Sequence, residues 1–146
     1  MKKLIFTFLL VTLPIANSAL ANEPRLPIVK TTSFKVVHVN ELEQWLKTDT
    51  ANVHVFDANN DDTRKANGLI PSAVALPSSS HYDVASLPSD KNSKLVFYCA
   101  NTDCMASHDA AKLALKSGYT NVYVMTDGIQ GWKKAGKPTQ KFAQKG

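Results

Sequence analysis

The sequence contains only two cysteines, Cys99 and Cys104, which is too few for a small domain held together by several disulfides. It has no internal repeat, so a single unit is the simplest organisation. After residue 21 no apolar stretch reaches the roughly 20 residues that a membrane-spanning helix needs. The chain beyond that point is expected to be one ordinary domain with its own core.

The first 21 residues have the pattern of a secretory signal peptide. Lys2 and Lys3 form a short positive region, residues 4–16 form an apolar run, and Ala19 and Ala21 are the small residues that a signal peptidase reads. The run is too short for a membrane anchor, and no cysteine follows it that could carry a lipid. Cleavage after Ala21 leaves 125 of the 146 residues, and a soluble periplasmic or secreted protein without a stable membrane anchor is expected.

Positive charge is spread along the chain and does not predict a nucleic-acid partner. The formal net charge of +5 falls to +3 when Lys2 and Lys3 leave with the signal peptide. The densest lysines lie near the C-terminus, where Phe142 is the only aromatic residue among them. They are expected to form a solvated helix face and a frayed end.

Short apolar segments alternate with amphipathic ones after a polar lead-in over residues 22–33. Strands are expected at 36–39, 53–56, 74–77, 94–98 and 122–125, and helices at 41–47, 107–116 and 129–135. Residues 59–67 have the composition of a loop with a short helix at most. The pattern predicts an α/β fold with a central parallel sheet of about five strands, helices on both faces, and a flexible C-terminal tail over 139–146.

Cys99 follows the most apolar strand, so chain order places it at the carboxyl edge of the sheet, where ligands bind in such folds. A loop and a helix beginning near Ser107 come next. Their N–H groups are expected to surround the sulfur, favour a thiolate or persulfide anion, and cradle a bound anion. The residues of this expected cradle are Ala100, Asn101, Thr102, Asp103, Cys104, Met105 and Ala106.

Five segments in the right order resemble the rhodanese-like domain family. They are residues 55–57 (Val-Phe-Asp), 68–73 (Gly-Leu-Ile-Pro-Ser-Ala), 98–99 (Tyr-Cys) with the loop and helix that follow, 118–123 (Gly-Tyr-Thr-Asn-Val-Tyr) and 127–132 (Asp-Gly-Ile-Gln-Gly-Trp). The resemblance covers about residues 34–138. It implies the rhodanese-like fold and a sulfurtransferase activity that needs no cofactor.

By this resemblance Cys99 is the nucleophile. It would take a sulfane sulfur from a small donor, hold it as a persulfide, and pass it to a thiol or similar acceptor, which can be a small molecule or a protein. Asp57 would hydrogen-bond the neighbouring loop. Ser107 is expected to be the N-cap of the helix, and its hydroxyl could also face the sulfur.

Several residues depart from the family pattern. The loop at 100–106 is longer than usual and has no Gly, Lys or Arg, while Asp103 adds negative charge, so thiosulfate is expected to be a poor donor. The missing arginine also disfavours the phosphatases and arsenate reductases built on this fold, which clamp an oxyanion. Asn59 replaces the arginine of the usual Asp-x-Arg, and Leu69 replaces the signature histidine.

Cys104 opens alternatives to sulfur transfer. It can close a disulfide with Cys99 if their Cα atoms come within about 7 Å, either as a resting bond or as the resolving thiol of a dithiol oxidoreductase. Cys99, Cys104, Met105 and His108 also offer soft or borderline ligands for Cu(I). A non-catalytic binding module or a Cu(I) or thiol carrier therefore stays open beside the sulfurtransferase.

Overall fold

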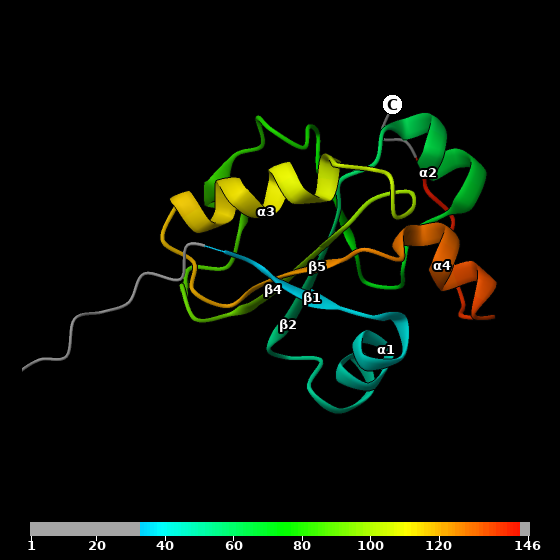
Figure 1. Cartoon of the computed structure of the whole chain (residues 1–146), viewed down its shortest axis with the longest axis horizontal. Helices are drawn as coiled ribbons and strands as arrows, with labels where there is room; N and C mark the ends of the chain where they lie inside the picture. The colour runs from blue at the N-terminus through cyan, green and yellow to red at the C-terminus, as the bar shows by residue number, and fades with distance from the viewer. Residues whose placement is uncertain (1–32, 144–146) are drawn as a thin grey trace, which may run out of the picture.

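A five-stranded parallel sheet forms the centre of the computed structural model, which describes residues 33–143 (Figure 1). The strands are β1 (Lys35–Val37), β2 (Val53–Asp57), β3 (Val74–Ala75), β4 (Lys94–Tyr98) and β5 (Val122–Met125). Their order across the sheet is β1-β5-β4-β2-β3. The signal peptide predicted at 1–21 and all but the last residue of the predicted lead-in lie outside the described residues.

β4 is central because its side chains are apolar on both faces. Residues 95–98 are fully buried, and β4 pairs with β2 on one side and with β5 on the other. An amphipathic strand in this place would bury polar groups against one layer of helices. The most apolar segment of the sequence therefore occupies the middle of the sheet, as predicted.

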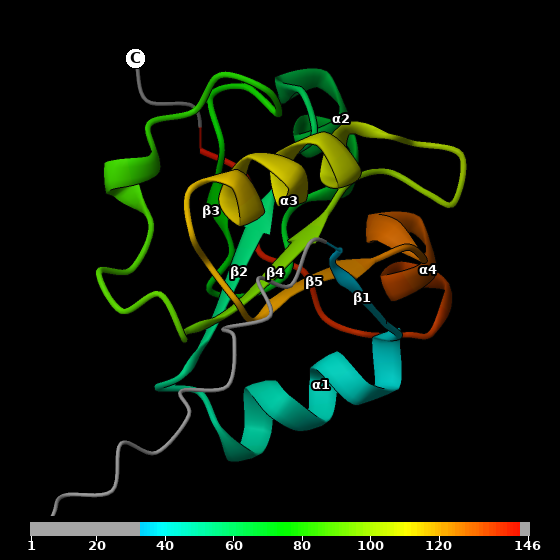
Figure 2. The ribbon, with the colours of Figure 1, turned by 60° about the vertical axis from the view of Figure 1, so that its left-hand side comes forward.

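Four helices cover the two faces. They are α1 (Val39–Thr48), α2 (Asp61–Asn67), α3 (Ala106–Lys116) and α4 (Gly128–Lys134). Figure 2 shows α3 on one face of the sheet and α1 and α4 on the other. Alternate sheet residues follow this division, with Phe97 and Val124 packing in the cluster that holds α3, and Val96 and Met125 in the cluster that holds α1 and α4.

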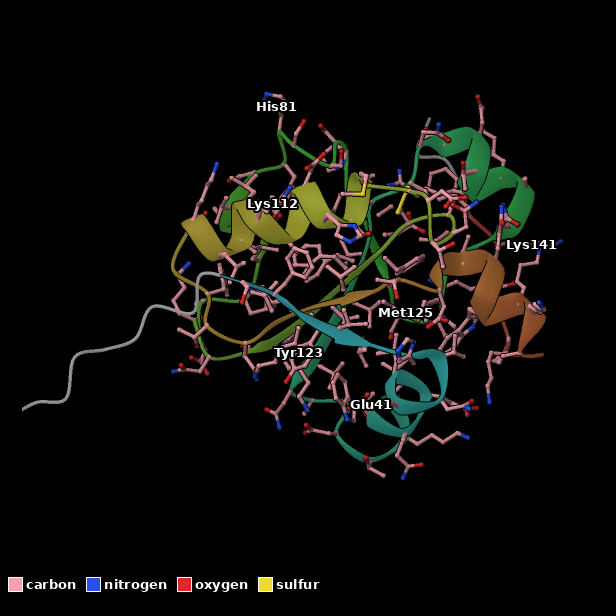
Figure 3. All side chains as sticks on the ribbon, in the orientation of Figure 1. Glu41, His81, Lys112, Tyr123, Met125 and Lys141 are labelled. Atoms are coloured by element: carbon pink, nitrogen blue, oxygen red, sulfur yellow. A yellow bond between two sulfur atoms is a disulfide. The ribbon has the colours of Figure 1, made fainter. Side chains whose placement is uncertain are left out.

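Side chains nearer the surface also divide between the α3 side and the α1 side of the sheet. In Figure 3, Tyr123 points to the side of α1, where its ring meets the edge of Trp45 with centroids 4.9 Å apart, whereas Lys112 and His81 lie on the opposite side. The predicted α/β class, parallel sheet and two helical layers are confirmed. Among residues 33–143 no helix has the length and apolar character needed to cross a bilayer.

α2 is a complete helix where the sequence predicted mostly loop. The side chain of Asn60 caps it by accepting a hydrogen bond from the backbone N–H of Thr63 at 2.9 Å. Its one buried residue is Arg64, so it has no apolar stripe that a hydrophobic pattern could reveal.

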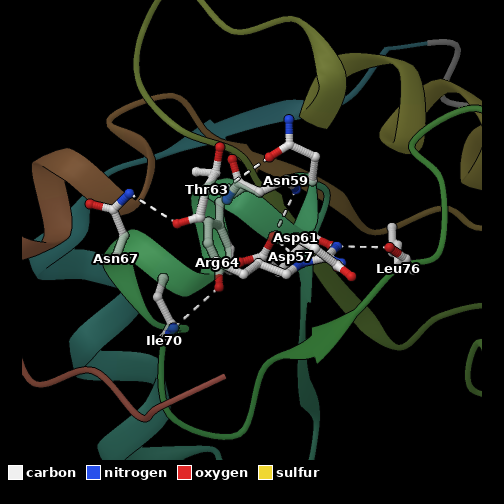
Figure 4. A network of polar contacts seen from close by, with 10 residues as sticks. Asp57, Asn59, Asp61, Thr63, Arg64, Asn67, Ile70 and Leu76 are labelled. Carbon is white, nitrogen blue, oxygen red and sulfur yellow. Dashed lines mark hydrogen bonds and ion pairs between the residues drawn. The ribbon is translucent and has the colours of Figure 1, made fainter. Parts of the chain in front are cut away.

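A buried ion pair ties α2 to the sheet (Figure 4). Nε of Arg64 lies 3.2 Å from Oδ1 of Asp57, and the two side chains are 5 % and 0 % exposed. Nη2 of Arg64 also donates to the carbonyl oxygens of Asp57 at 2.9 Å and Leu76 at 2.7 Å. The guanidinium of Arg64, on α2, therefore pairs with the Asp57 carboxylate, although Asn59 replaces the arginine of the family pattern.

Residues 139–143, which were assigned to a flexible C-terminal tail from the sequence, contact the segment that follows α2. Gln140 exchanges two backbone hydrogen bonds of 2.9 Å with Leu69, and the ring of Phe142 lies 5.5 Å from the Arg64 guanidinium. Gly68 permits this contact, because a Cβ there would lie 2.7 Å from the carbonyl oxygen of Gln140. Residues 144–146 lie outside the described residues.

Arg64→Gln is expected to lower the free energy of unfolding by about 3 kcal/mol, because it leaves the Asp57 carboxylate buried without its cation. Urea denaturation followed by circular dichroism measures the change. Lys65→Gln, on the exposed side of the same helix, is the matched control and should stay within about 0.5 kcal/mol of the wild type. Equal effects of the two substitutions would contradict the role given to the ion pair.

Candidate active site around Cys99 and Cys104

Cys99 lies directly after β4, at the carboxyl edge of the sheet. Its side chain is 1 % exposed and belongs to the apolar cluster between the sheet and α3. Cys99 therefore lies at the carboxyl edge of the sheet, as chain order predicted. Its sulfur is buried beneath the surface.

Cys99 and Cys104 form a disulfide, with their Cα atoms 6.2 Å apart. This meets the distance condition for the pair that the sequence analysis left open. Asn101 shapes the turn between them, because its carbonyl accepts from the N–H of Cys104 and its side chain from that of Asp103, both at 3.2 Å. Of the two cysteines, only Cys104 is partly exposed.

Ser107 contacts the sulfur of Cys99 and does not cap α3. Its Oγ lies 3.3 Å from Sγ of Cys99, and the Cys104 carbonyl oxygen lies 3.1 Å from the same sulfur. A disulfide sulfur carries no hydrogen, so the hydroxyl is the donor in the first contact. The N-cap is Met105, without a side-chain cap, because its backbone already has helical angles and Ser107 falls inside the first turn. The predicted N-cap is wrong, whereas the alternative role facing the sulfur matches the geometry.

The predicted amide cradle is not assembled around the sulfur in this form. Among the described residues no backbone N–H donates to Sγ of Cys99, and the amides of Asp103 and Cys104 are used by Asn101. The cradle over residues 100–106 therefore stays a prediction for the reduced protein.

The N-terminus of α4 holds the start of the loop. The N–H of Ile129 donates to the Cys99 carbonyl at 2.8 Å, and that of Gln130 to the Ala100 carbonyl at 3.0 Å. Gly128 makes this approach possible, since a Cβ there would lie 2.4 Å from the Ala100 carbonyl carbon and oxygen. Its φ of +64° also favours glycine. This explains why glycine follows Asp127 in the segment that resembled the family.

Asp57 and Tyr98 end the paired strands β2 and β4, and both side chains bind backbone N–H groups of neighbouring segments. Oδ1 of Asp57 accepts from the N–H of Asn59 at 2.7 Å, as the sequence analysis expected. The hydroxyl of Tyr98 accepts from the N–H of Ile70 at 3.1 Å. Burial raises the pKa of Tyr98, and the nearby charge of Asp57 raises it further, so this hydroxyl stays neutral.

A groove of about 390 Å³ opens beside Cys104. No charged side chain lines it. Asn59 is 7 % exposed there, and its Nδ2 has no hydrogen-bond partner among the described residues. This groove was not predicted from the sequence, although residues that follow neighbouring parallel strands share one edge of the sheet. Its polar lining consists of Asn59, Asn60, Thr63, Ser78 and Ser79.

The four residues considered for Cu(I) are not arranged as a ligand set. The disulfide uses both thiols, and the side chain of Met105 is exposed. The ring of His108 packs edge-on against Phe34, with centroids 5.2 Å apart. Within residues 33–143 no group of three His, Cys, Asp or Glu side chains could hold a metal ion.

The sequence model of the rhodanese-like domain matches residues 38–135, which include every strand after β1 and all four helices. This chain belongs to the rhodanese-like domain family. The comparison with curated proteins found no match to this sequence.

Solved structures share the fold of this rhodanese-like domain. A single-domain sulfurtransferase of Saccharomyces cerevisiae is 19 % identical, with a TM-score of 0.60 over 74 % of this chain and 98 % of that one. The rhodanese-like domain of an Anabaena protein is 23 % identical, with a TM-score of 0.61 over 75 % and 81 %. A Rhodopseudomonas palustris protein described as a possible tyrosine phosphatase is 23 % identical, with a TM-score of 0.61 over 76 % and 88 %.

The phosphatase description does not carry over to the present site. Arg64 is the only arginine among residues 33–143, and it is buried against Asp57, Asp61 and Leu76. Within the part of the chain that the structure describes, no arginine is therefore free to clamp a phosphate beside Cys99.

Gly128→Ala is expected to destabilise the rhodanese-like domain by about 2 kcal/mol more than Gly136→Ala, because only the first adds an overpacked contact. Both glycines have positive φ, at +64° and +71°, but a Cβ at Gly136 would meet nothing within 4 Å. Thermal and urea unfolding measure the difference. Similar losses for both variants would mean that backbone conformation alone matters at Gly128.

Proposed function

We propose that this rhodanese-like domain is an extracytoplasmic sulfurtransferase or persulfide carrier that uses Cys99. The observation that carries the proposal is the position of Cys99 at the end of the central strand, with the Ser107 hydroxyl 3.3 Å from its sulfur at the start of α3. A hydroxyl donor and a helix N-terminus both favour a sulfur anion at this point. Family membership supports the same chemistry.

Sulfur enters in a balanced exchange. The reduced Cys99 thiolate attacks the outer, sulfane sulfur of a persulfide donor, the S–S bond of the donor breaks, and the donor leaves as a thiolate. Cys99 then carries the sulfur as a persulfide. An acceptor thiolate attacks that outer sulfur and releases Cys99 as a thiolate again.

The disulfide form cannot begin this exchange, because a sulfur that is already bonded to Cys104 is not a nucleophile. Reduction must come first. The uncharged groove and the loop without Lys or Arg favour a neutral or weakly charged donor over thiosulfate.

Export rests on the signal-peptide pattern of residues 1–21. The disulfide supports it, since such bonds persist mainly in oxidising compartments. The proposed acceptor is a small or protein thiol in the same compartment, and the proposal includes neither a nucleic-acid partner nor a stable membrane anchor.

Cys104→Ser is expected to gain one sulfur atom per chain from a low-molecular-weight persulfide without prior reduction, because it keeps the Cys99 thiol and cannot form the disulfide. Intact-mass spectrometry measures the gain, and peptide mapping places it. The wild type should load only after treatment with a reductant. The matched control is the double variant Cys99→Ser, Cys104→Ser, and equal loading of this control would refute the role of Cys99.

Asp103→Asn is expected to speed sulfur loading from thiosulfate by up to about threefold at low ionic strength, because it removes a repulsive charge from the loop. Asp103 is exposed, so the fold should be unaffected. The rate is measured in the Cys104→Ser background. Loading from a persulfide with a neutral substituent, which carries less negative charge than thiosulfate, should change less, and high salt should abolish the gain. An unchanged thiosulfate rate at low salt would show that Asp103 does not repel the donor.

A further inference from the structure

The two sulfurs of the disulfide have different surroundings. Cys99 is 1 % exposed and does not line the groove, whereas Cys104 is partly exposed and forms part of its wall. An external thiol that reaches this disulfide through the groove meets the sulfur of Cys104. Cys99 lies behind it, in the position of the leaving group.

The groove also indicates which kind of thiol fits. Its lining carries amide and hydroxyl groups and no charge. The buried Nδ2 of Asn59 has no partner among the described residues, and a buried unpaired donor costs about 1–3 kcal/mol until an acceptor reaches it. A carbonyl oxygen is such an acceptor. Met105, which follows Cys104 in the sequence, has an exposed side chain that offers apolar contact.

We propose that Cys104 is the entry point for a cysteine-containing peptide or protein segment, which exchanges its thiol with the Cys99–Cys104 disulfide. A peptide carbonyl next to the incoming cysteine bonds the amide of Asn59. This activity goes beyond sulfur transfer, because it requires both cysteines and no sulfane donor.

The exchange takes two steps. The peptide thiolate attacks Sγ of Cys104, the bond between Cys104 and Cys99 breaks, and its electron pair leaves on Sγ of Cys99. A second peptide thiolate then attacks the peptide sulfur of this mixed disulfide and releases Cys104 as a thiolate. Two thiols are oxidised to one peptide disulfide, and the protein disulfide gains the two electrons.

The surroundings of Cys99 suit it to leave as an anion. Ser107 places its hydroxyl 3.3 Å from Sγ, within the first turn of the eleven-residue helix α3. A thiolate formed there gains a hydrogen bond and the positive end of the helix dipole. Attack in the opposite sense, on Cys99, would require a nucleophile inside the apolar cluster.

The test uses the oxidised protein, residues 22–146, and a short neutral peptide with blocked ends and one central cysteine. After brief mixing, free thiols are blocked with N-ethylmaleimide and the adducts are mapped by mass spectrometry. The expected products carry the peptide on Cys104 and maleimide on Cys99. Peptide on Cys99, or a disulfide that stays intact while a soluble phosphine reduces it, would overturn the proposal.

A second measurement traps the first adduct, because Cys99 can attack it again. Cys99→Ala and Cys104→Ala are each mixed with the same peptide activated as a thiopyridyl disulfide. The free Cys104 of the first variant is expected to react faster than the free Cys99 of the second. An equal or slower rate would also overturn the assignment of Cys104 as the entry point.

Asn59→Ala tests recognition of the peptide. It should slow exchange with the peptide about fivefold, which corresponds to one lost hydrogen bond, and leave exchange with 2-mercaptoethanol unchanged. Asn92→Ala, at an exposed asparagine that does not line the groove, is the matched control. An equal effect on both thiols would refute recognition of the carbonyl. Sulfur loading of Cys104→Ser is independent of these results, so failure of the exchange and failure of sulfur transfer can be told apart.

Discussion

Two backbone hydrogen bonds fix the place of Cys99. They run from the first turn of α4 to the carbonyls of Cys99 and Ala100, and they hold the chain as it leaves β4. The bonds require close approach of two backbones, which Gly128 permits. The position of Cys99 thus depends on main-chain geometry. The loop over residues 101–106 can vary in length and charge while Cys99 stays in the same place.

Much of the fold could be predicted because hydrophobic periodicity reports burial. The continuous apolar segment at 94–98 identified the central strand, and alternation of strands with amphipathic helices predicted the parallel sheet. α2 was underestimated because Arg64 is its buried residue, and a pattern of apolar side chains cannot reveal a helix anchored by a buried ion pair.

The site was predicted in part. Chain order was sufficient to place Cys99 at the carboxyl edge, and spacing was sufficient to suggest a bond with Cys104. Burial of Cys99 beneath Cys104 depends on packing against α3, which the sequence does not show. Ser107 was predicted to be the N-cap of α3 because serine is common at that position. The helix starts one residue earlier, at Ala106, so Ser107 lies within its first turn. The groove combines residues that follow β2 and β3, and only the assembled sheet brings them to Cys104.

The short bridge between Gln140 and Leu69 joins the end of the described chain to the segment just after α2. The ring of Phe142 lies next to the guanidinium of Arg64, which also donates a hydrogen bond to the carbonyl of Asp57 at the end of β2. Phe142 therefore covers part of the buried ion pair between Arg64 and Asp57. A chain that stops at Pro138 would lose both the bridge to Leu69 and the ring over Arg64.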